Sequence, residues 1–286
     1  MERRLGITRE RPLPAPAREP LTAWLRRRGG SPPSTARGGA ERRADGRRVA
    51  LLPDTFNAYF TPAVAIAAVE LFEAAGLAVV VPRVGCCGRP LLSHGRVAAA
   101  RAAARAMVDA LSPLAAAGVP IVGLEPSCVS MFGDEYAYLL PGDPAARAVA
   151  DAASTFDAFV ATRAGTGDVG WAFDGRPRRL LLHGHCHQQA REGTAAAHAA
   201  LALPAGHRVE AVDAGCCGMA GAFGYEAEHH AVSLAMAEQR LLPAVRAAAP
   251  DDVIVAAGFS CRQQIAHATG RRAWHPAEVL RAALDA

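Results

Sequence analysis

The sequence has no lysine, no Cys-x-x-Cys pair and no long hydrophobic run, and these absences narrow what the protein can be. Without a Cys-x-x-Cys pair, a thioredoxin-like active site is poorly supported. No apolar run reaches the roughly 18 residues of a membrane span, and the basic N-terminus lacks the apolar stretch of a signal peptide. We therefore expect a cytoplasmic protein that meets a membrane at most peripherally.

All 31 basic residues are arginine, and they are unevenly distributed along the chain. Residues 1–48 contain 13 arginines against 5 acidic residues, a net charge of +8, whereas the other 238 residues carry a net charge of −4. The first 48 residues are also rich in proline and glycine and have no sustained hydrophobic period, which predicts a mostly disordered linker in which "LTAWLRRR" (21–28) can form one short helix. Aromatic residues make up only 6%, with no stacking pattern, so no nucleic-acid partner is expected.

From residue 49 onward, short apolar runs alternate with helical stretches. "VALLP" (49–53) is typical of a strand, residues 61–76 form an apolar helical pattern that ends at Gly76, and "LAVVVP" (77–82) is again typical of a strand. This alternation predicts an α/β fold with parallel sheets covered by helices.

The chain also contains an internal repeat. An offset of 130 residues carries Cys86-Cys87-Gly88 onto Cys216-Cys217-Gly218, and three further residues carry "IVGLEPSC" (121–128) onto "IVAAGFSC" (254–261). Agreement at separate places indicates a duplication rather than chance. We predict two similar parallel-sheet α/β units, residues 49–165 and 166–286.

Four of the seven cysteines follow predicted strands in the second unit, namely Cys186, Cys216, Cys217 and Cys261. Ligands bind at the carboxyl ends of parallel strands, so these cysteines are expected to converge. Four thiolates are a complete set for a tetrahedral metal ion or an iron–sulfur cluster. Gly215 and Gly218 permit the sharp bend that two adjacent ligands need. Residues 227–249 form the pattern of one long helix, and its start near Glu226 is expected to direct its amides at the thiolates.

The histidines of "HGHCHQ" (183–188) alternate, as side chains on one face of a strand do. One or two of them, with His185 and His187 as candidates, are metal ligands, or else they donate hydrogen bonds to the thiolates. Three other chemistries stay open: a Cys–His nucleophile at Cys186, thiol–disulfide exchange between Cys216 and Cys217, and a phosphate cradle in the nearby glycines, which do not match Gly-x-Gly-x-x-Gly.

The first unit is a degenerate copy, because the offset places Phe56 opposite Cys186. The cysteines that remain are Cys86, Cys87 and Cys128. They can hold a metal or cluster if a fourth ligand joins them, the candidates being Asp54, His94 and Glu125. The alternative is that this unit has lost its site and serves as scaffold.

The paired GCCG stretches, "LHGHCHQ", "GCCGMAGAFGYEAEHH" and "GFSCRQQI" resemble the duplicated cysteine-rich CCG domain. That domain occurs in the heterodisulfide reductase B subunit and in the iron–sulfur subunits of glycolate and glycerol-3-phosphate dehydrogenases. It also forms the C-terminus of FAD-linked D-lactate and D-2-hydroxyglutarate dehydrogenase-type proteins, which "LLPDTFNAYF" and "CCGRPLLSHG" resemble most. The resemblance covers nearly everything from residue 48 onward.

The resemblance implies an electron-transfer role as part of a flavin-linked 2-hydroxy-acid oxidoreductase. It implies that the cysteines of both units are cofactor ligands, and that a flavoprotein and a ferredoxin-like domain or subunit are partners, with FAD only on a partner. Gly258 and Glu125 replace the first cysteine of the family's final Cys-x-x-Cys, so a 4Fe-4S or simpler iron–sulfur cluster and zinc in a docking module both stay open. We expect a non-catalytic redox subunit or a C-terminal fragment.

Overall fold

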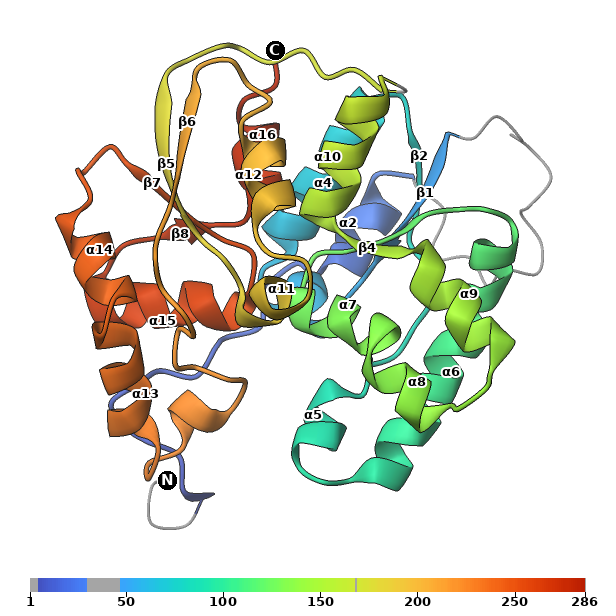
Figure 1. Ribbon diagram of the computed structural model, residues 1–286, viewed down its shortest axis with the longest axis horizontal. Coiled ribbons are helices and arrows are strands. Elements are labelled where there is room, and N and C mark those ends of the chain that lie inside the picture. Colours follow the sequence, from blue (N-terminus) through green and yellow to red (C-terminus); the bar gives the residue numbers. More distant parts are fainter. Residues whose placement is uncertain (1–4, 30–46, 168, 286) are drawn as a thin grey trace. The chain divides into compact units, whose positions relative to one another are not determined.

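The computed structural model describes residues 5–29, 47–167 and 169–285, which divide into two compact units. The N-terminal unit is Pro16–Trp171, and the C-terminal unit runs from Ala172 onward and includes the residues up to Ala15. Each unit is built on a four-stranded sheet whose strands are all parallel (Figure 1). The predicted fold class, two α/β units with parallel sheets, is confirmed.

The sheet of the N-terminal unit has the strand order β2-β1-β3-β4. The elements of this unit are α2 (Leu21–Arg27), β1 (Arg48–Leu52), α3 (Thr55–Tyr59), α4 (Pro62–Ala74), β2 (Ala78–Val80), α5 (Arg89–Ser93), α6 (Val97–Ala116), β3 (Ile121–Gly123), α7 (Pro126–Gly133), α8 (Glu135–Leu139), α9 (Pro144–Ala152), β4 (Ala153–Thr155) and α10 (Phe156–Thr166). The central strand β1 is buried along four of its five residues, as expected for a strand with helices on both faces.

The sheet of the C-terminal unit has the matching order β6-β5-β7-β8. The elements of this unit are β5 (Arg178–His183), α11 (Cys186–Arg191), α12 (Ala195–Leu201), β6 (His207–Ala211), the 3₁₀ turn η1 (Phe223–Tyr225), α13 (His230–Glu238), α14 (Leu241–Ala247), β7 (Val253–Ala256), α15 (Phe259–Thr269), β8 (Ala273–Trp274) and α16 (Pro276–Arg281).

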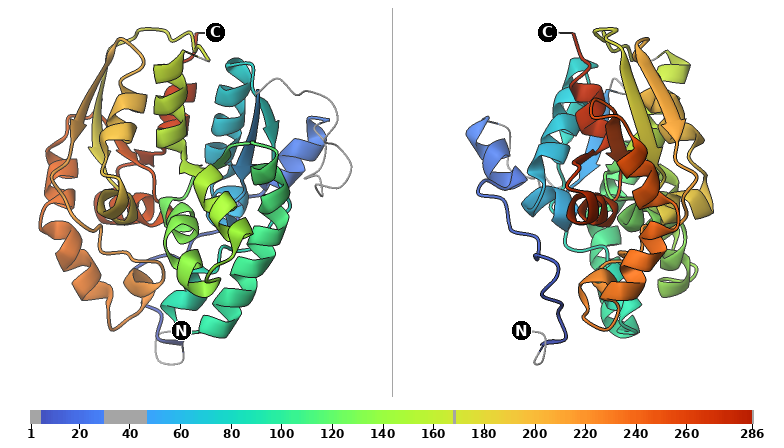
Figure 2. Two further views of the ribbon diagram at one scale, coloured as in Figure 1. Left: turned by 45° about the vertical axis from the view of Figure 1, so that its right-hand side comes forward. Right: turned by 90° about the vertical axis from the view of Figure 1, so that its left-hand side faces the viewer.

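Alternate residues of β5 serve two separate cores. Leu180 and Leu182 pack in the cluster with α12 and α16, whereas Leu181 packs in the cluster with α14 and α15. This two-residue period follows from the pleat of a strand. Helices therefore cover both faces of the sheet, which Figure 2 shows with α12 and α16 on one side and α14 and α15 on the other.

The strand order defines where a ligand can reach each sheet. In the C-terminal unit the chain passes from β5 to its neighbour β6 and then crosses to β7 on the other side of β5. The loops after β5 and β7 therefore run in opposite directions, and the carboxyl ends of these two strands are the switch point at which ligands bind in open parallel sheets. In the N-terminal unit, β1 and β3 occupy the same positions.

The prediction of disorder for residues 1–48 does not hold for residues 5–29. Helix α2 is formed there, and its Leu21 is fully buried because Leu21 and Leu25 lie four residues apart on one apolar face. The short helix expected at residues 21–28 is therefore confirmed. Residues 1–4 and 30–46 lie outside the described residues.

The predicted long helix over residues 227–249 is two helices, α13 and α14. The break falls at Arg240, whose φ of −148° leaves the helical region. Pro243 explains it, because proline has no N–H for the carbonyl of Gln239 and its ring crowds that carbonyl. Among the described residues, no helix is both long and apolar enough to cross a bilayer.

Removing one buried hydroxyl tests how the N-terminal core is held. Tyr136 is fully buried, and its hydroxyl donates a 2.9 Å hydrogen bond to the carbonyl of Cys87. We expect Tyr136→Phe to lower the free energy of unfolding by about 1–2 kcal/mol, because the carbonyl stays buried without its donor. Urea denaturation measures this, with Tyr138→Phe, 78% exposed, as the control that leaves the midpoint unchanged. Equal midpoints for both variants would contradict the prediction.

Candidate metal centre

Three groups that can ligate a soft metal meet at the carboxyl ends of the strands in the C-terminal unit. His183 is the last residue of β5, Cys261 lies in the first turn of α15 after β7, and Cys217 lies in the loop after β6. Their ligand atoms all lie within 4.8 Å of one another. The side chains are 1%, 1% and 4% exposed, so the group is shielded from water.

The loop after β6 is shaped by its backbone. Gly218 has a φ of +80°, which reverses the chain after the two cysteines. Its N–H donates to the sulfur of Cys216 at 3.3 Å, and the N–H of Met219 donates to the sulfur of Cys217. These loop amides take the role predicted for a helix near Glu226, because α13 starts only at His230.

Cys186 and Cys216 extend this group toward solvent. Cys186 is the first residue of α11, and both thiols are half-buried. Cys186 interacts with Cys216, Cys216 with Cys217, and Cys217 with Cys261. The structure therefore brings together all four cysteines predicted for the second unit.

The pKa directions alternate along this series of sulfurs. The pKa of Cys216 is lowered, chiefly by the thiol of Cys186, and that of Cys261 is lowered, chiefly by the thiol of Cys217 and also by His183. The pKa of Cys186 and that of Cys217 are raised, each chiefly by its interaction with Cys216. The alternation follows from hydrogen bonds between neighbouring thiols, and metal binding would require these thiols to lose their protons.

His183 is the histidine of the compact group, whereas the sequence pattern favours His185 and His187. Both ring nitrogens of His183 are buried without a hydrogen bond of standard geometry, although the ring lies beside the thiol of Cys261. Burial lowers its pKa, but negative charge and hydrogen bonding at Cys261, with a smaller effect of Cys216, outweigh this, so the net pKa is raised. A buried imidazole beside thiolates, without a well-formed hydrogen bond, fits a metal ligand or a donor to a ligand sulfur.

His185 lies at the edge of the group and has a second task. Its Nδ1 accepts the N–H of His187 as the N-cap of α11, and the two rings stack at 5.5 Å. The other edge of the ring faces Gly258, where an added Cβ would lie 2.2 Å from Cδ2 of His185 and 3.3 Å from the sulfur of Cys261. The ring therefore fills the space that a side chain at residue 258 would take.

The N-terminal unit gathers its three cysteines less completely. The sulfurs of Cys87 and Cys128 lie 3.2 Å apart, and Cys86 interacts with Cys87 but is exposed. Two of the predicted fourth ligands are used as helix caps: Asp54 accepts the N–H groups of Phe56 and Asn57, and Glu125 accepts from Ser127.

The third candidate, His94, is the C-cap residue of α5 and is exposed. The electrostatics of the N-terminal unit also oppose thiolates. The pKa of Cys86 and that of Cys87 are raised, chiefly by hydrogen bonds to the next thiol in each case. The pKa of Cys128 is lowered by Cys87 but raised overall, because burial and the charges of Asp54 and Glu125 outweigh that contact.

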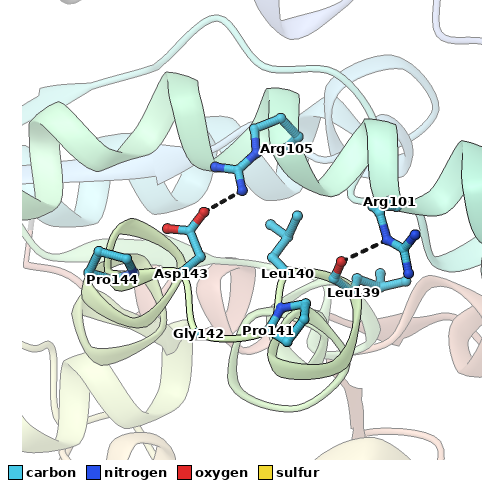
Figure 3. Close-up of a pocket in the computed structure, with 8 residues that line it drawn as sticks. All are labelled: Arg101, Arg105, Leu139, Leu140, Pro141, Gly142, Asp143 and Pro144. Carbon is cyan, nitrogen blue, oxygen red and sulfur yellow. Dashed lines mark hydrogen bonds and ion pairs between the residues drawn. The ribbon is translucent and has the colours of Figure 1, made fainter.

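A pocket of about 550 Å³ in the N-terminal unit lies away from these cysteines (Figure 3). It lies between α6 and the segment that joins α8 to α9. Its two arginines are already engaged, because Arg105 pairs with Asp143 and Arg101 donates to the carbonyl of Leu139 at 2.9 Å. The pocket therefore offers little unpaired charge to a ligand.

The fold and the thiol loops define a class, a duplicated α/β protein with an adjacent cysteine pair after the second strand of each sheet. The model of the CCG cysteine-rich domain matches residues 54–133 and 180–266. The chain belongs to this cysteine-rich domain family.

Curated relatives carry the same region. The chain is 31% identical to a D-2-hydroxyglutarate dehydrogenase of Escherichia coli over 84% of its own length and 23% of that protein. It is 24% identical to one of the subunits of the Escherichia coli anaerobic glycerol-3-phosphate dehydrogenase, over 83% of the chain and 59% of the relative. It is 28% identical to lactate utilization protein A 1 of Bacillus cereus, over 75% of the chain and 90% of the relative. The chain thus spans about a quarter of the first of these proteins.

Replacing His183 is expected to change metal affinity and folding stability in opposite directions. We expect His183→Leu to raise the melting temperature of the metal-free chain, because a buried group without a partner costs about 1–3 kcal/mol. The same variant should bind metal about 10–100-fold more weakly. Calorimetry and metal titration measure the two effects, with His187→Leu as the comparison. Unchanged metal affinity in His183→Leu would contradict the assignment.

Proposed function

We propose that the chain is the iron–sulfur electron-transfer component of a flavin-linked 2-hydroxy-acid oxidoreductase, with the cluster in the C-terminal unit. The observation that carries the proposal is the meeting of four cysteines from three distant places, Cys186, Cys216–Cys217 and Cys261, beyond the strand ends. Adjacent thiolates suit a cluster because each can ligate a different iron. A cluster bound there supplies one-electron transfer.

The chain's own residues support this chemistry in three ways. Cys217 and Cys261 are buried, so water is kept from that side of the site. The N–H groups of Gly218 and Met219 donate to ligand sulfurs, and such hydrogen bonds tune a cluster's reduction potential. His183 adds a further ligand, or a donor that orients a ligand sulfur.

The electron source is inferred from the relatives. Their names refer to D-2-hydroxyglutarate, glycerol-3-phosphate and lactate, all secondary alcohols whose oxidation releases two electrons. Hydride chemistry needs a cofactor such as flavin. The proposed partners are therefore a flavoprotein, which holds FAD, and a ferredoxin-like domain or subunit that passes electrons on to this chain.

Analysis of anaerobically purified protein tests the proposal. We expect iron and acid-labile sulfide in the purified chain, visible absorbance, and an electron paramagnetic resonance signal in one of its redox states. Exposure to a chelator and oxygen should bleach the absorbance. A colourless protein with near-stoichiometric zinc and no iron would contradict the electron-transfer function and favour a zinc-stabilised docking module.

A further inference from the structure

The N-terminal segment carries an arginine into the C-terminal unit. Ile7 and Glu226 form an antiparallel bridge, flanked by hydrogen bonds from the N–H of Thr8 to the carbonyl of Tyr225 at 2.8 Å and from Ala227 to Gly6 at 2.6 Å. Figure 1 shows this dark-blue segment beside α13 and the orange loop. Arg11 lies three residues after Thr8. Its side chain contacts Met219 in the loop after β6 that carries Cys216 and Cys217, here called the cysteine loop.

Arg11 is a buried cation. It is 3% exposed, its Nη1 donates to Sδ of Met219, its Nη2 donates to Oε1 of Gln264 at 2.5 Å, and its guanidinium lies 5.7 Å from the ring centre of Tyr225. Within the described residues no carboxylate pairs with it, and its Nε has no hydrogen-bond partner. A buried charge without a counter-charge is strongly unfavourable, so this position requires a negative group nearby.

The orientation of the guanidinium is fixed by its acceptor. Gln264 is fully buried, and its Nε2 donates to the carbonyl of Ser233 at 3.0 Å and to its hydroxyl at 3.3 Å. The amide oxygen of Gln264 must therefore face Arg11. The neighbouring carboxylate of Glu10 is occupied by His230 at 3.3 Å.

The part of the site that Arg11 contacts is the cysteine loop, whose thiols metal binding would make negative. Met219, which accepts one guanidinium N–H, lies two residues after Cys217 and donates its own N–H to that sulfur. Burial lowers the pKa of Arg11, and negative charge on the phenol of Tyr225 or on the thiol of Cys217 opposes that effect. Of these two groups only the thiol must lose its proton when a metal binds, so Cys217 is the one that metal binding makes negative.

We propose that Arg11 is the counter-charge of the metal–thiolate centre, a positioning residue whose positive charge stabilises the ligand set of Cys186, Cys216, Cys217 and Cys261. This inference rests on the proposed function. Four thiolates carry two more negative charges than a divalent ion neutralises. In a site shielded from water, a fixed cation offsets that excess far more strongly than it would in solvent.

Titration of the 286-residue apo chain with Co²⁺ under anaerobic conditions tests the proposal, because thiolate-to-cobalt absorption reports binding at the sulfurs. We expect Arg11→Gln to weaken Co²⁺ affinity about 10–100-fold, the range for residues that support a ligand set. Arg11→Lys should retain most of the affinity, because it keeps the charge. Arg178→Gln is the matched control: Arg178 begins β5 at the opposite end from the site and pairs with Asp174 at 2.9 Å.

A second variant leaves Arg11 in place and cancels its charge. Gln264→Glu supplies a nearly isosteric carboxylate to the guanidinium, so it should weaken Co²⁺ affinity as Arg11→Gln does. The variant also loses the donation from Nε2 to the carbonyl of Ser233, so a thermal melt checks that it stays folded at the titration temperature. Wild-type affinity in Gln264→Glu or in Arg11→Gln, or an equal loss in Arg11→Lys and Arg11→Gln, would overturn the inference alone. A wild-type chain that takes up no Co²⁺ would overturn the proposed function together with it.

Discussion

Cys217→Ser and Cys261→Ser are each expected to abolish metal binding by the chain. Both sulfurs are buried in the compact group with His183, so no solvent-borne ligand can replace them. A serine oxygen stays protonated and is a poor partner for a soft metal, so a four-ligand site is left with three ligands. We expect an affinity loss of more than about 100-fold, beyond the usual effect of supporting residues. Iron and sulfide content, or Co²⁺ titration, measures it.

The internal repeat provides matched controls for this result. Cys87 and Cys128 occupy the positions of Cys217 and Cys261 in the N-terminal unit, and their sulfurs lie 3.2 Å apart. In that unit burial, Asp54 and Glu125 raise the pKa of Cys128 against the opposing contact with Cys87, and both carboxylates serve as helix caps. We therefore expect Cys87→Ser and Cys128→Ser to leave the metal content unchanged. Equal metal loss in both pairs would place a second site in the N-terminal unit and contradict the one-site interpretation.

The stability of the same variants gives an independent measurement. Metal that binds only the folded chain adds stability in proportion to the logarithm of its excess over the dissociation constant, about 4 kcal/mol at a 1,000-fold excess. The loaded wild type should therefore melt well above Cys261→Ser, and the two should melt alike once the wild type is treated with a chelator. A difference that persists after chelation would mean that Cys261 acts through packing instead.

The fold and the convergence of the second-unit cysteines could be predicted from patterns that are visible in the sequence. Alternating apolar runs identified the strands, and the 130-residue offset between Cys86-Cys87 and Cys216-Cys217 revealed the duplication. In a parallel sheet, the rule that loops gather at the carboxyl ends of strands is enough to bring Cys186 and Cys261 together. None of these steps required side-chain geometry.

The details that were missed depend on where one element ends or on contacts far along the chain. His183, His185 and His187 alternate, but β5 ends at His183 and α11 begins at Cys186, so the alternation no longer describes their directions. Arg11 reaches Gln264 across 253 positions, and nothing local marks it as buried. The break between α13 and α14 is different, because Pro243 was a readable signal for it.

Gly218→Ala is expected to unfold the cysteine loop and to remove metal binding with it. Gly218 has a φ of +80°, and an added Cβ would lie 2.1 Å from the backbone carbonyl oxygen of Ser233 in α13. The left-handed conformation alone costs about 1–3 kcal/mol for alanine, and the clash must move either the helix or the loop. Because the N–H of Gly218 also donates to Cys216, any shift of the loop displaces two ligands at once.

Two other glycines allow the effect of backbone strain and the effect of a steric clash to be tested separately. Gly221, in the same loop, has a φ of +66° with nothing within 4 Å of an added Cβ, so Gly221→Ala carries the strain without the clash. Gly206 carries the clash without the strain, 2.2 Å from the carbonyl of Gly175, and precedes β6 at the end away from the site. Thermal melts and Co²⁺ titration of the three variants should show Gly206→Ala destabilised with normal affinity, and Gly218→Ala deficient in both. Equal Co²⁺ affinity in Gly218→Ala and Gly206→Ala would show that metal binding does not depend on the backbone geometry of the Cys216–Cys217 turn.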